Sequence, residues 1–246
     1  MPTIYLSPST QEANIYVTDG NSEEYYMNKI ADAMEPYLRS SGIKYIRNTP
    51  QMTAASSIAQ SNAGDYDAHI ALHSNAAPEG RYGEVRGSEV YFYPYSSNSR
   101  RLADIIAANL KEIYPIPDRV RAVPTTFLGE VTRTRAPAVL IEFAYHDNAD
   151  DATWIQENIT PIAENVVLSL TEFFDIPFIT PQRVRIGTVN LSSGNLNIRS
   201  KPDVTAAIIG KIPNGAKVTV YSQYDGWYVI GYENTVGYAA SRFIAT

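Results

Sequence analysis

Residues 137–148 read PAVLIEFAYHDN, and this stretch decides the class of fold. It begins with an almost uninterrupted apolar run, which is typical of a central strand covered on both faces of a parallel sheet. Other runs rich in apolar and aromatic residues predict further strands, at residues 3–6, 43–46, 67–76 and 87–95. The sequence therefore predicts a sheet whose strands are spread over most of the first two thirds of the chain.

Helical patterns separate these predicted strands. Apolar side chains recur three or four positions apart, as on one face of a helix, at Met27, Ile30, Met34 and Leu38. Gly42 is expected to end this helix. Three more helices are predicted, at residues 52–62, 99–114 and 161–174. Strands that alternate with helices indicate an α/β fold, with a mostly parallel sheet flanked by helices.

The chain changes character after Asp175. Residues 176–182 (IPFITPQ) contain two prolines and are expected to form a short, stiff linker. Residues 183–246 hold strand-like runs between turn signals and no helical periodicity, so they predict a small all-β barrel. The net charge also changes, from −10 over residues 1–182 to +4 beyond them. We therefore predict two domains, at residues 1–175 and 183–246, with different tasks.

The composition excludes several classes of protein. The 246 residues include no cysteine, so there is no disulfide, thiolate metal site or cysteine nucleophile. A metal ion would need ligands from Asp, Glu, neutral oxygens or the three histidines. The net charge of −6 argues against general binding of nucleic acid, and no apolar run reaches the roughly 18 residues that span a membrane. The N-terminus shows no signal-peptide pattern.

Ionisable side chains stand at the ends of the predicted strands. His73 follows a buried run, and Glu142 lies inside the apolar run PAVLIEFAY. A carboxylate in such a run is costly for stability unless it is paired or has a function. Ligands of open α/β sheets bind just beyond the carboxyl ends of the strands. A histidine and a carboxylate that meet there suit zinc, and Glu142 is then placed to accept a proton from the activated water.

Each of these residues also has a structural alternative. His73 can be a hydrogen-bonded histidine of the interior, and Glu23 and Glu24 fall in the first turn of a helix, where carboxylates favour the positive end of the dipole. His69 lies on the same face as His73 but about 13 Å along the strand, so it is expected to be structural. His146 follows the apolar strand and either lines the cleft or has a structural role.

Two runs, ALHSNA (residues 71–76) and VLIEFAYHDN (residues 139–148), resemble the zinc-dependent N-acetylmuramoyl-L-alanine amidases. Members of that family carry a His-x-Asn-Ala run and a Pro-Ala-Val-Leu-x-Glu strand, with an asparagine six residues after the glutamate. The matching positions here are His73, Asn75, Ala76, Pro137, Ala138, Val139, Leu140, Glu142 and Asn148. The family's Ile-Ala pair, seven and eight positions after a glutamate, favours Glu23 over Glu24 as the zinc carboxylate. The resemblance covers residues 1–175.

The chain departs from the family at the first zinc ligand. The family has a histidine in a glycine-rich turn after the first strand, whereas this turn reads SPSTQEAN (residues 7–14). Thr10 stands at the ligand position and Gln11 follows it; a glutamine oxygen can coordinate a metal but is a weaker, neutral ligand. Three alternatives remain: Gln11 replaces the histidine, a water fills the gap, or the metal and the activity are lost. We expect the first, because the turn is still directed to the same place.

Residues 183–246 resemble a bacterial SH3-like domain. Such domains carry a Leu-Asn-Val-Arg run followed by a proline, an Asn-Gly turn, and later Gly-Trp-Tyr and Gly-Tyr motifs. The matching segments begin at Leu196, Pro202, Asn214, Gly226 and Gly237. The resemblance implies binding of cell-wall components, mostly peptidoglycan peptides. We expect an aromatic groove on the surface, formed by Tyr221, Tyr224 and Tyr238, and we expect Trp227 in the core.

Together, the two resemblances imply a peptidoglycan hydrolase with a wall-binding module. The reaction would cleave the amide between the lactyl group of N-acetylmuramic acid and L-alanine of the stem peptide, with a zinc-activated water. The site residues implied are Glu142 as general base, Gln11, Glu23 and His73 as zinc ligands, and Asn75 and His146 as substrate contacts. Partners would be peptidoglycan and anionic wall polymers, at an extracellular or cell-wall location. The alternative is a catalytically degenerate amidase fold that only binds the wall.

Overall fold

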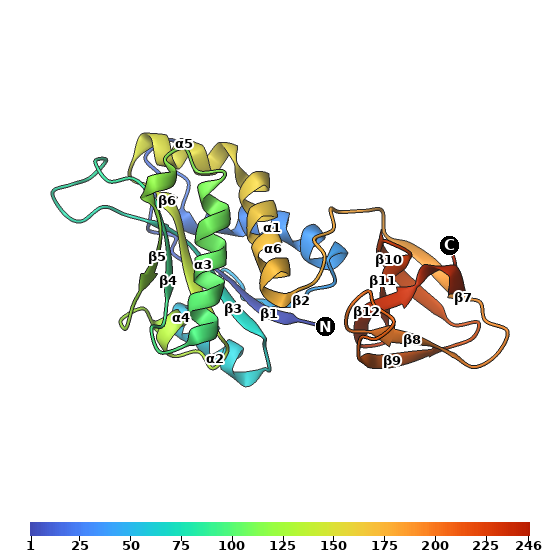
Figure 1. Cartoon of the computed structure of the whole chain (residues 1–246). Coiled ribbons are helices and arrows are strands. Elements are labelled where there is room, and N and C mark those ends of the chain that lie inside the picture. Colours follow the sequence, from blue (N-terminus) through green and yellow to red (C-terminus); the bar gives the residue numbers. More distant parts are fainter. The chain divides into compact units, whose positions relative to one another are not determined.

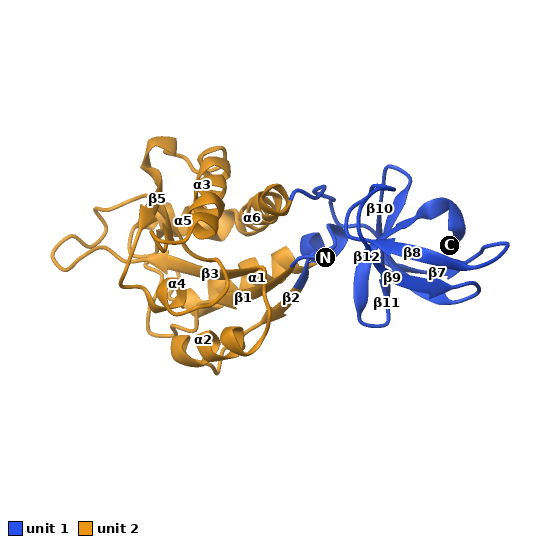
Figure 2. Cartoon of the chain, turned by 60° about the horizontal axis from the view of Figure 1, so that its bottom comes forward, with its two compact units in different colours: residues 1–2, 36–44, 175–246 blue, residues 3–35, 45–174 orange.

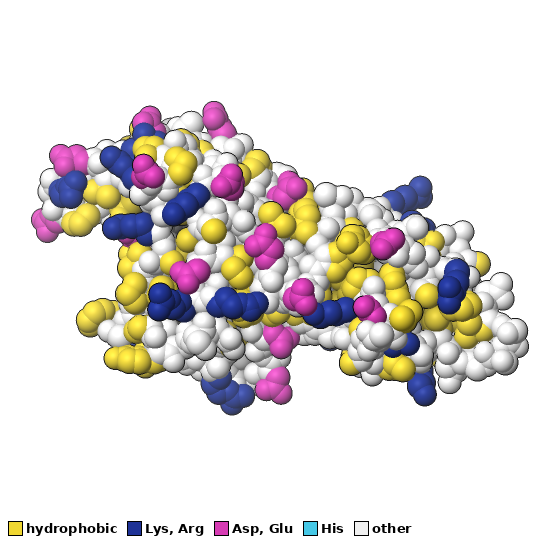
Figure 3. All heavy atoms as spheres, viewed as in Figure 1, with side chains coloured by type: hydrophobic (Ala, Val, Ile, Leu, Met, Phe, Trp, Pro, Cys, Tyr) yellow, Lys and Arg dark blue, Asp and Glu magenta, His cyan; other side chains and the backbone are white.

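The computed structural model describes residues 1–246 and divides into two compact units. The larger unit holds residues 3–35 and 45–174, and the smaller unit holds residues 1–2, 36–44 and 175–246 (Figure 2). None of the helices combines the length and the apolar character that crossing a membrane requires. No histidine is visible on the face shown in Figure 3, and all three histidines are buried.

The first sheet has six strands in the order β2-β1-β3-β6-β4-β5 (Figure 1). Their bounds are Thr3–Pro8 for β1, Lys44–Arg47 for β2, Ala68–Asn75 for β3, Ser88–Phe92 for β4, Val120–Pro124 for β5 and Ala138–Tyr145 for β6. β1, β3 and β6 are parallel neighbours, whereas β4 is antiparallel to β6 and parallel to β5. The predicted α/β fold is confirmed, and its sheet is mixed because the chain direction reverses between β6 and β4.

β6 is the central strand that the apolar run predicts. It pairs with β3 on one side and with β4 on the other. Val139, Ile141 and Phe143 point to one face of the sheet and have no exposed surface. Leu140 and Ala144 point to the other face and are buried as well, so both faces of this strand are covered. Burial of apolar surface at about 25 cal/mol per Å² makes this strand a main source of stability for the larger unit.

Six helices accompany the sheet (Figure 1). Their bounds are Glu23–Ser40 for α1, Ala54–Ala63 for α2, Ser97–Lys111 for α3, Gly129–Thr132 for α4, Ala149–Glu157 for α5 and Ile159–Phe174 for α6. The apolar positions predicted for the first helix are completely buried on α1, at Met27, Ile30, Met34 and Leu38. Gly42 follows α1 with a φ of 76°, a left-handed conformation in which glycine is favoured and the helix ends.

One strand and two α-helices of the larger unit were not predicted: β5, α4 and α5. β5 is a short strand at the edge of the sheet, and α4 has only four residues. A single turn shows no periodicity, so its sequence does not distinguish it from a loop. α5 begins directly after β6, where the side chain of Asn148 caps it by accepting from the backbone N–H groups of Asp150 and Asp151.

The smaller unit contains a seven-stranded antiparallel sheet in the order β13-β7-β10-β11-β12-β8-β9. The bounds are Arg185–Val189 for β7, Asn195–Arg199 for β8, Ile208–Pro213 for β9, Lys217–Tyr224 for β10, Trp227–Tyr232 for β11, Thr235–Ala240 for β12 and Ile244–Ala245 for β13. Alternate residues point inward to a small core that includes Ile198, Val220 and Ile230. The predicted all-β, SH3-like architecture is confirmed.

Candidate active site

β3 and β6 bring His73 and Glu142 side by side. The two strands pair in parallel, and His73 stands opposite Glu142 in their register. β1 lies on the other side of β3, and the backbone N–H of Ser9 donates to the carbonyl of Leu72 (2.9 Å). This bond holds the turn after β1 beside the end of β3, so the side chains of that turn lie next to His73.

The structure brings Gln11, Glu23 and His73 together. Nδ1 of His73 lies 2.8 Å from Oε1 of Glu23 and 3.3 Å from Nε2 of Gln11. Asn14 links Glu23 to Gln11, because its Nδ2 donates both to Oε2 of Glu23 (2.6 Å) and to Oε1 of Gln11 (3.1 Å). Glu24 instead accepts a hydrogen bond within its own helix (3.1 Å). Of the two acids that open α1, only Glu23 thus contacts His73.

Glu130, from α4, contacts the opposite edge of the His73 ring. Its Oε2 lies 3.2 Å from Nε2 of His73, and its Oε1 lies 3.2 Å from Nε2 of His69. Oε1 also accepts a hydrogen bond from Oγ of Ser7 (2.5 Å). Sequence analysis missed Glu130, because the one-turn helix that carries it was not predicted. The buried His69, expected to be structural, therefore connects to the site through this carboxylate.

The charges in this cluster are strongly coupled. Burial alone would raise the pKa of Glu130, but hydrogen bonds from His69 and His73 outweigh it and lower the pKa to about 2. Burial likewise opposes ionisation of Glu23, yet the bond to the His73 ring lowers the pKa of Glu23. Burial would lower the pKa of His73, but Glu130 and Glu23 raise it well above its usual value. The metal-free cluster therefore favours a charged ring between two carboxylates.

Glu142 differs from these carboxylates because one of its oxygens, Oε2, is buried without a hydrogen-bond partner. The pKa of Glu142 is raised to about 7, mainly by burial; the charge of His73 lowers it, and the carboxylates of Glu23 and Glu89 add to the rise. Glu89 stands opposite Glu142 on β4 and pairs with Arg121. A carboxyl group with a free oxygen and a pKa near neutrality can both accept and return a proton.

The two predicted substrate contacts have different surroundings. Asn75 is half-buried at the end of β3, where its Oδ1 accepts from the backbone N–H of Ala76 (2.9 Å). His146 is buried, with its ring stacked on Tyr16 and its Nδ1 3.0 Å from the carbonyl oxygen of Ser74. The structure therefore supports a structural role for His146 over the predicted contact with substrate, whereas a substrate contact for Asn75 stays a prediction.

The residues of the cluster fit a metal ion only as a mixed set of donors. No group of three or more His, Cys, Asp or Glu side chains is close enough to hold a metal ion. Glu23 Oε1 and the Gln11 amide both face Nδ1 of His73, while Nε2 of that ring is turned to Glu130. A half-turn of the amide would bring its oxygen to the His73 side, and Asn14, whose Nδ2 now donates to that oxygen, would have to turn with it. One imidazole, one carboxylate and one neutral oxygen can therefore converge, and zinc accepts nitrogen and oxygen ligands.

A cavity of about 360 Å³ opens beside this cluster. It is lined by Gln11, His73 and Glu130, together with hydroxyl groups of the turn after β1 and of the start of α2. Neither Glu23 nor Glu142 lines this cavity, so it borders the cluster only on the side of Gln11, His73 and Glu130.

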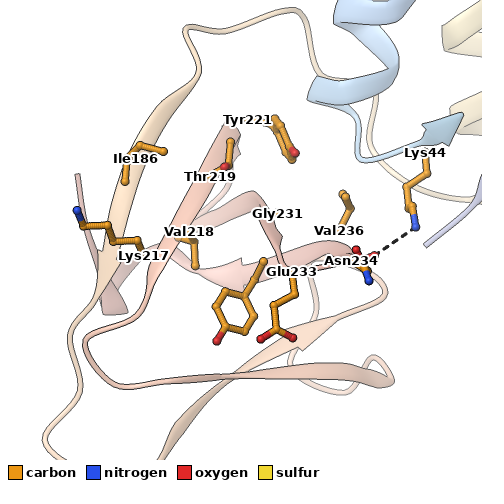
Figure 4. Close-up of a pocket in the computed structure, with 11 residues that line it drawn as sticks. Lys44, Ile186, Lys217, Val218, Thr219, Tyr221, Gly231, Glu233, Asn234 and Val236 are labelled. Carbon is orange, nitrogen blue, oxygen red and sulfur yellow. Dashed lines mark hydrogen bonds between the residues drawn. The ribbon is translucent and has the colours of Figure 1, made fainter.

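In the smaller unit, the prediction of an aromatic groove on the surface fails for one of its three tyrosines. Tyr238 is completely buried and packs with Ile179 and Val229, so the prediction that it binds the cell wall is wrong. Because side chains alternate along a strand, Tyr238 points to the face of the sheet opposite to Ala239, which lies in the small core. Ile179 covers Tyr238 there, and the Tyr238 hydroxyl donates to the carbonyl of Ser41 (3.2 Å). Tyr224 is 42% exposed, and Tyr221 lines a hollow of about 740 Å³ with polar neighbours such as Lys217, Thr219 and Glu233 (Figure 4). Trp227, expected in the core, is half-buried and packs against the Tyr238 cluster with part of its side chain exposed.

Comparison with known proteins shows the class to which this sheet and its cluster of ionisable side chains belong. A sequence profile of the N-acetylmuramoyl-L-alanine amidases matches residues 9–172, and the chain belongs to that family. A profile of the bacterial SH3 domain matches residues 194–245. The chain is 25% identical, over 97 residues, to YrvJ of Bacillus subtilis strain 168, a candidate N-acetylmuramoyl-L-alanine amidase. That match covers 39% of this chain and 19% of the length of YrvJ.

Solved structures show the same fold at low sequence identity. An N-acetylmuramoyl-L-alanine amidase from Clostridium difficile 630 superimposes with a TM-score of 0.64 at 16% identity, covering 71% of this chain and 97% of that one. The catalytic domain of CwlV, from Bacillus (Paenibacillus) polymyxa var. colistinus, gives 0.62 at 16% identity, over 72% and 100%. The catalytic domain of the CD27L endolysin, which targets Clostridia difficile, gives 0.56 at 22% identity, over 70% and 98%.

Proposed function

We propose that the chain is a peptidoglycan hydrolase that cleaves the amide between the lactyl group of N-acetylmuramic acid and L-alanine of the stem peptide. Membership of the amidase family supports this class of reaction. The observation that carries the proposal is the buried, unpartnered oxygen of Glu142 beside the cluster of Gln11, Glu23 and His73. Such an oxygen is costly for stability, so its presence at this edge of the sheet fits a functional role.

Glu142 is the general base of the proposed reaction. Its free oxygen and its pKa of about 7 suit it to accept a proton from the attacking water. It then passes that proton to the departing amine of L-alanine, which is a poor leaving group unless it is protonated. The carboxyl group thus serves both halves of the hydrolysis.

Gln11, Glu23 and His73 are the proposed zinc ligands. A bound zinc ion would polarise the amide carbonyl and acidify the attacking water. To bind the ion, His73 gives up the proton on Nδ1, while Nε2 can keep its hydrogen bond to Glu130. Gln11 takes the place of the histidine that the family has in this turn, and contributes no charge.

Three measurements on the purified protein test this function. We expect elemental analysis to find about one zinc ion per chain, and dye release from purified cell walls to stop in a chelator and return with added zinc. New L-alanine amino termini should accumulate as the walls are cut. Full release in the chelator would overturn the zinc assignment, and release without new L-alanine termini would overturn the choice of bond.

A wall-binding protein without activity is the second candidate function. It is favoured by the absence of a histidine from residues 7–14 and by His73, whose two ring nitrogens both face carboxylates. A positively charged imidazole is not a metal ligand. A protein that binds cell walls but neither takes up zinc nor releases dye would support this candidate over the hydrolase.

The smaller unit is proposed to bind the cell wall, which places the protein at the wall or outside the cell. The match to the bacterial SH3 domain supports this role. The hollow beside Tyr221 offers an aromatic ring with charged neighbours of both signs, Lys217 and Glu233, as suits a peptide (Figure 4). Residues 183–246 carry a net charge of +4, which would add attraction to anionic wall polymers.

A further inference from the structure

We propose that Glu130 is a positioning residue for His73: its carboxylate holds Nε2 of the ring, so that Nδ1 faces Glu23 and Gln11. The first part of the proposal, that Glu130 raises the affinity for zinc, rests on the zinc site proposed above. The second part, that Glu130 fixes the orientation of the His73 ring, rests on the geometry of this chain alone. These two parts can therefore be tested separately.

The His73 ring is held from both edges. Nδ1 lies 2.8 Å from Oε1 of Glu23, and Nε2 lies 3.2 Å from Oε2 of Glu130. A half-turn of the ring about its bond to Cβ would bring carbon atoms to both carboxylates and lose both contacts. Without Glu130, only the Glu23 side would oppose that rotation.

Glu130 is itself fixed. Its side chain is 6% exposed, and its second oxygen contacts both Oγ of Ser7 and Nε2 of His69. These partners lie on β1 and β3, while α4 packs against β6 and α2. With Oε1 engaged by two elements of the sheet, Oε2 is left directed at His73. The carboxylate therefore acts as a rigid support and not as a mobile counter-ion.

The chemistry of imidazole ligands gives this support a consequence. A histidine that binds a metal through one nitrogen commonly donates the other N–H to a carboxylate, which orients the ring and makes it a stronger donor. Loss of such a partner typically weakens metal binding about 10–100-fold. The effect should be large here, because Gln11 is a neutral ligand and leaves His73 as the only imidazole next to Glu23.

Zinc affinity, measured by competition with a chelator, tests the first part in the full chain. Glu130→Ala is expected to bind zinc about 10–100-fold more weakly than the wild type. Glu130→Gln should lose less, because its amide oxygen can still accept from Nε2. His69→Gln is the matched control: it removes the other histidine from the same carboxylate, and its affinity should stay near that of the wild type.

The proton on Nε2 of His73 tests the second part, with or without zinc. Nitrogen–proton spectra should show it in the wild type and in His69→Gln, because it is buried and hydrogen-bonded. In Glu130→Ala it should be lost to exchange with water. If that variant fails to fold, Glu130→Gln takes its place, with a shifted signal expected.

The outcomes separate this inference from the proposed function. Unchanged zinc affinity together with an unchanged Nε2 proton in the Glu130 variants would overturn it. The inference would also be overturned if His69→Gln lost zinc affinity and the Nε2 proton signal as much as Glu130→Ala does. General disruption of the cluster, and not the contact between Glu130 and His73, would then explain the losses. A wild type that takes up no zinc would overturn the zinc site alone, and loss of the proton in Glu130→Ala would still support the positioning of the ring.

Discussion

The side chain of Glu142 packs within the sheet, and its carboxylate can accept a proton. One substitution can separate these two properties. Glu142→Gln keeps the first and removes the second. We expect the variant to fold and to hold zinc like the wild type, while dye release from cell walls falls by a factor of about 10²–10⁴. Glu24→Gln is the control, because Glu24 bonds within its own helix. Dye release within a few-fold of the wild type would remove Glu142 from the mechanism.

The raised pKa of Glu142 also predicts how stability depends on pH in the metal-free protein. The unfolded chain ionises Glu142 near its ordinary pKa of about 4.3, whereas the folded chain holds the proton up to a pH of about 7. The folded state thus binds more protons between these values, and its free energy of unfolding falls as the pH rises through this window. The fall amounts to about 4 kcal/mol at most.

Urea denaturation in a chelator at pH 5 and pH 8 measures this fall. In Glu142→Gln, the free energy of unfolding should fall less between pH 5 and pH 8, because the contribution of Glu142 is missing. The variant should therefore be more stable than the wild type at pH 8. His73 contributes a fall of the same sign, because the stability that comes with its raised pKa is lost as the pH rises. Glu142 is one of the groups that raise the pKa of His73, so this contribution is smaller in Glu142→Gln and changes in the same direction as the contribution of Glu142 itself. Equal pH dependence of the two proteins would contradict the buried, protonated state of Glu142.

Gln11 decides how tightly the proposed site holds zinc. Gln11→His adds an imidazole beside Nδ1 of His73, where the amide nitrogen now lies 3.3 Å away, and should slow the loss of zinc to a chelator. Gln11→Ala should speed it, since no donor remains at that position. Equal rates for all three proteins would show that Gln11 is not a ligand.

At the scale of elements, the sequence predicts what long patterns encode. The apolar run around Glu142 and the helical face of α1 predicted both elements, and the register of β3 with β6 then places His73 beside Glu142. Glu130 and Glu89 were missed for different reasons. Glu130 lies on a helix of one turn, and Glu89 meets Glu142 only because β4 pairs antiparallel to β6, which no local pattern specifies.

The side chain of Asn148 makes two kinds of contact at the start of α5. Asn148 accepts from the N–H groups of Asp150 (3.1 Å) and Asp151 (3.2 Å), and its Nδ2 donates to the carbonyl of Gly83 (2.5 Å). Asn148→Ala should lower the free energy of unfolding by about 1–2 kcal/mol. Asn148→Asp keeps the cap but loses the donor to Gly83, so it should cost less.

Thermal or urea denaturation checks this prediction. Thr53→Ala serves as the comparison, because it removes the side-chain cap of α2. Unlike Asn148, Thr53 does not also bond to a distant loop. Its loss should be about 1 kcal/mol. If Asn148→Ala costs no more than a surface substitution, the cap does not stabilise the larger unit.

At the scale of the whole molecule, wall binding and hydrolysis should separate. The full-length Glu142→Gln variant is expected to co-sediment with purified cell walls as the wild type does, because the wall-binding role is assigned to the smaller unit. Since residues 183–246 carry a net charge of +4, binding should weaken between low salt and about 0.5 M salt, where screening shortens the range of the charges. Binding that ignores salt would exclude the contribution of anionic polymers.

The strand order has a consequence for synthesis of the chain. β6, at residues 138–145, pairs with β3 and β4, which precede it by many residues. Until β6 has left the ribosome, β3 and β4 have no common neighbour, and the nascent chain holds two separate half-sheets with open edges. Such late, long-range pairing is slow and leaves the intermediate prone to aggregation. A nascent chain released before residue 138 should therefore be captured by chaperones, whereas one that ends after α6 should fold.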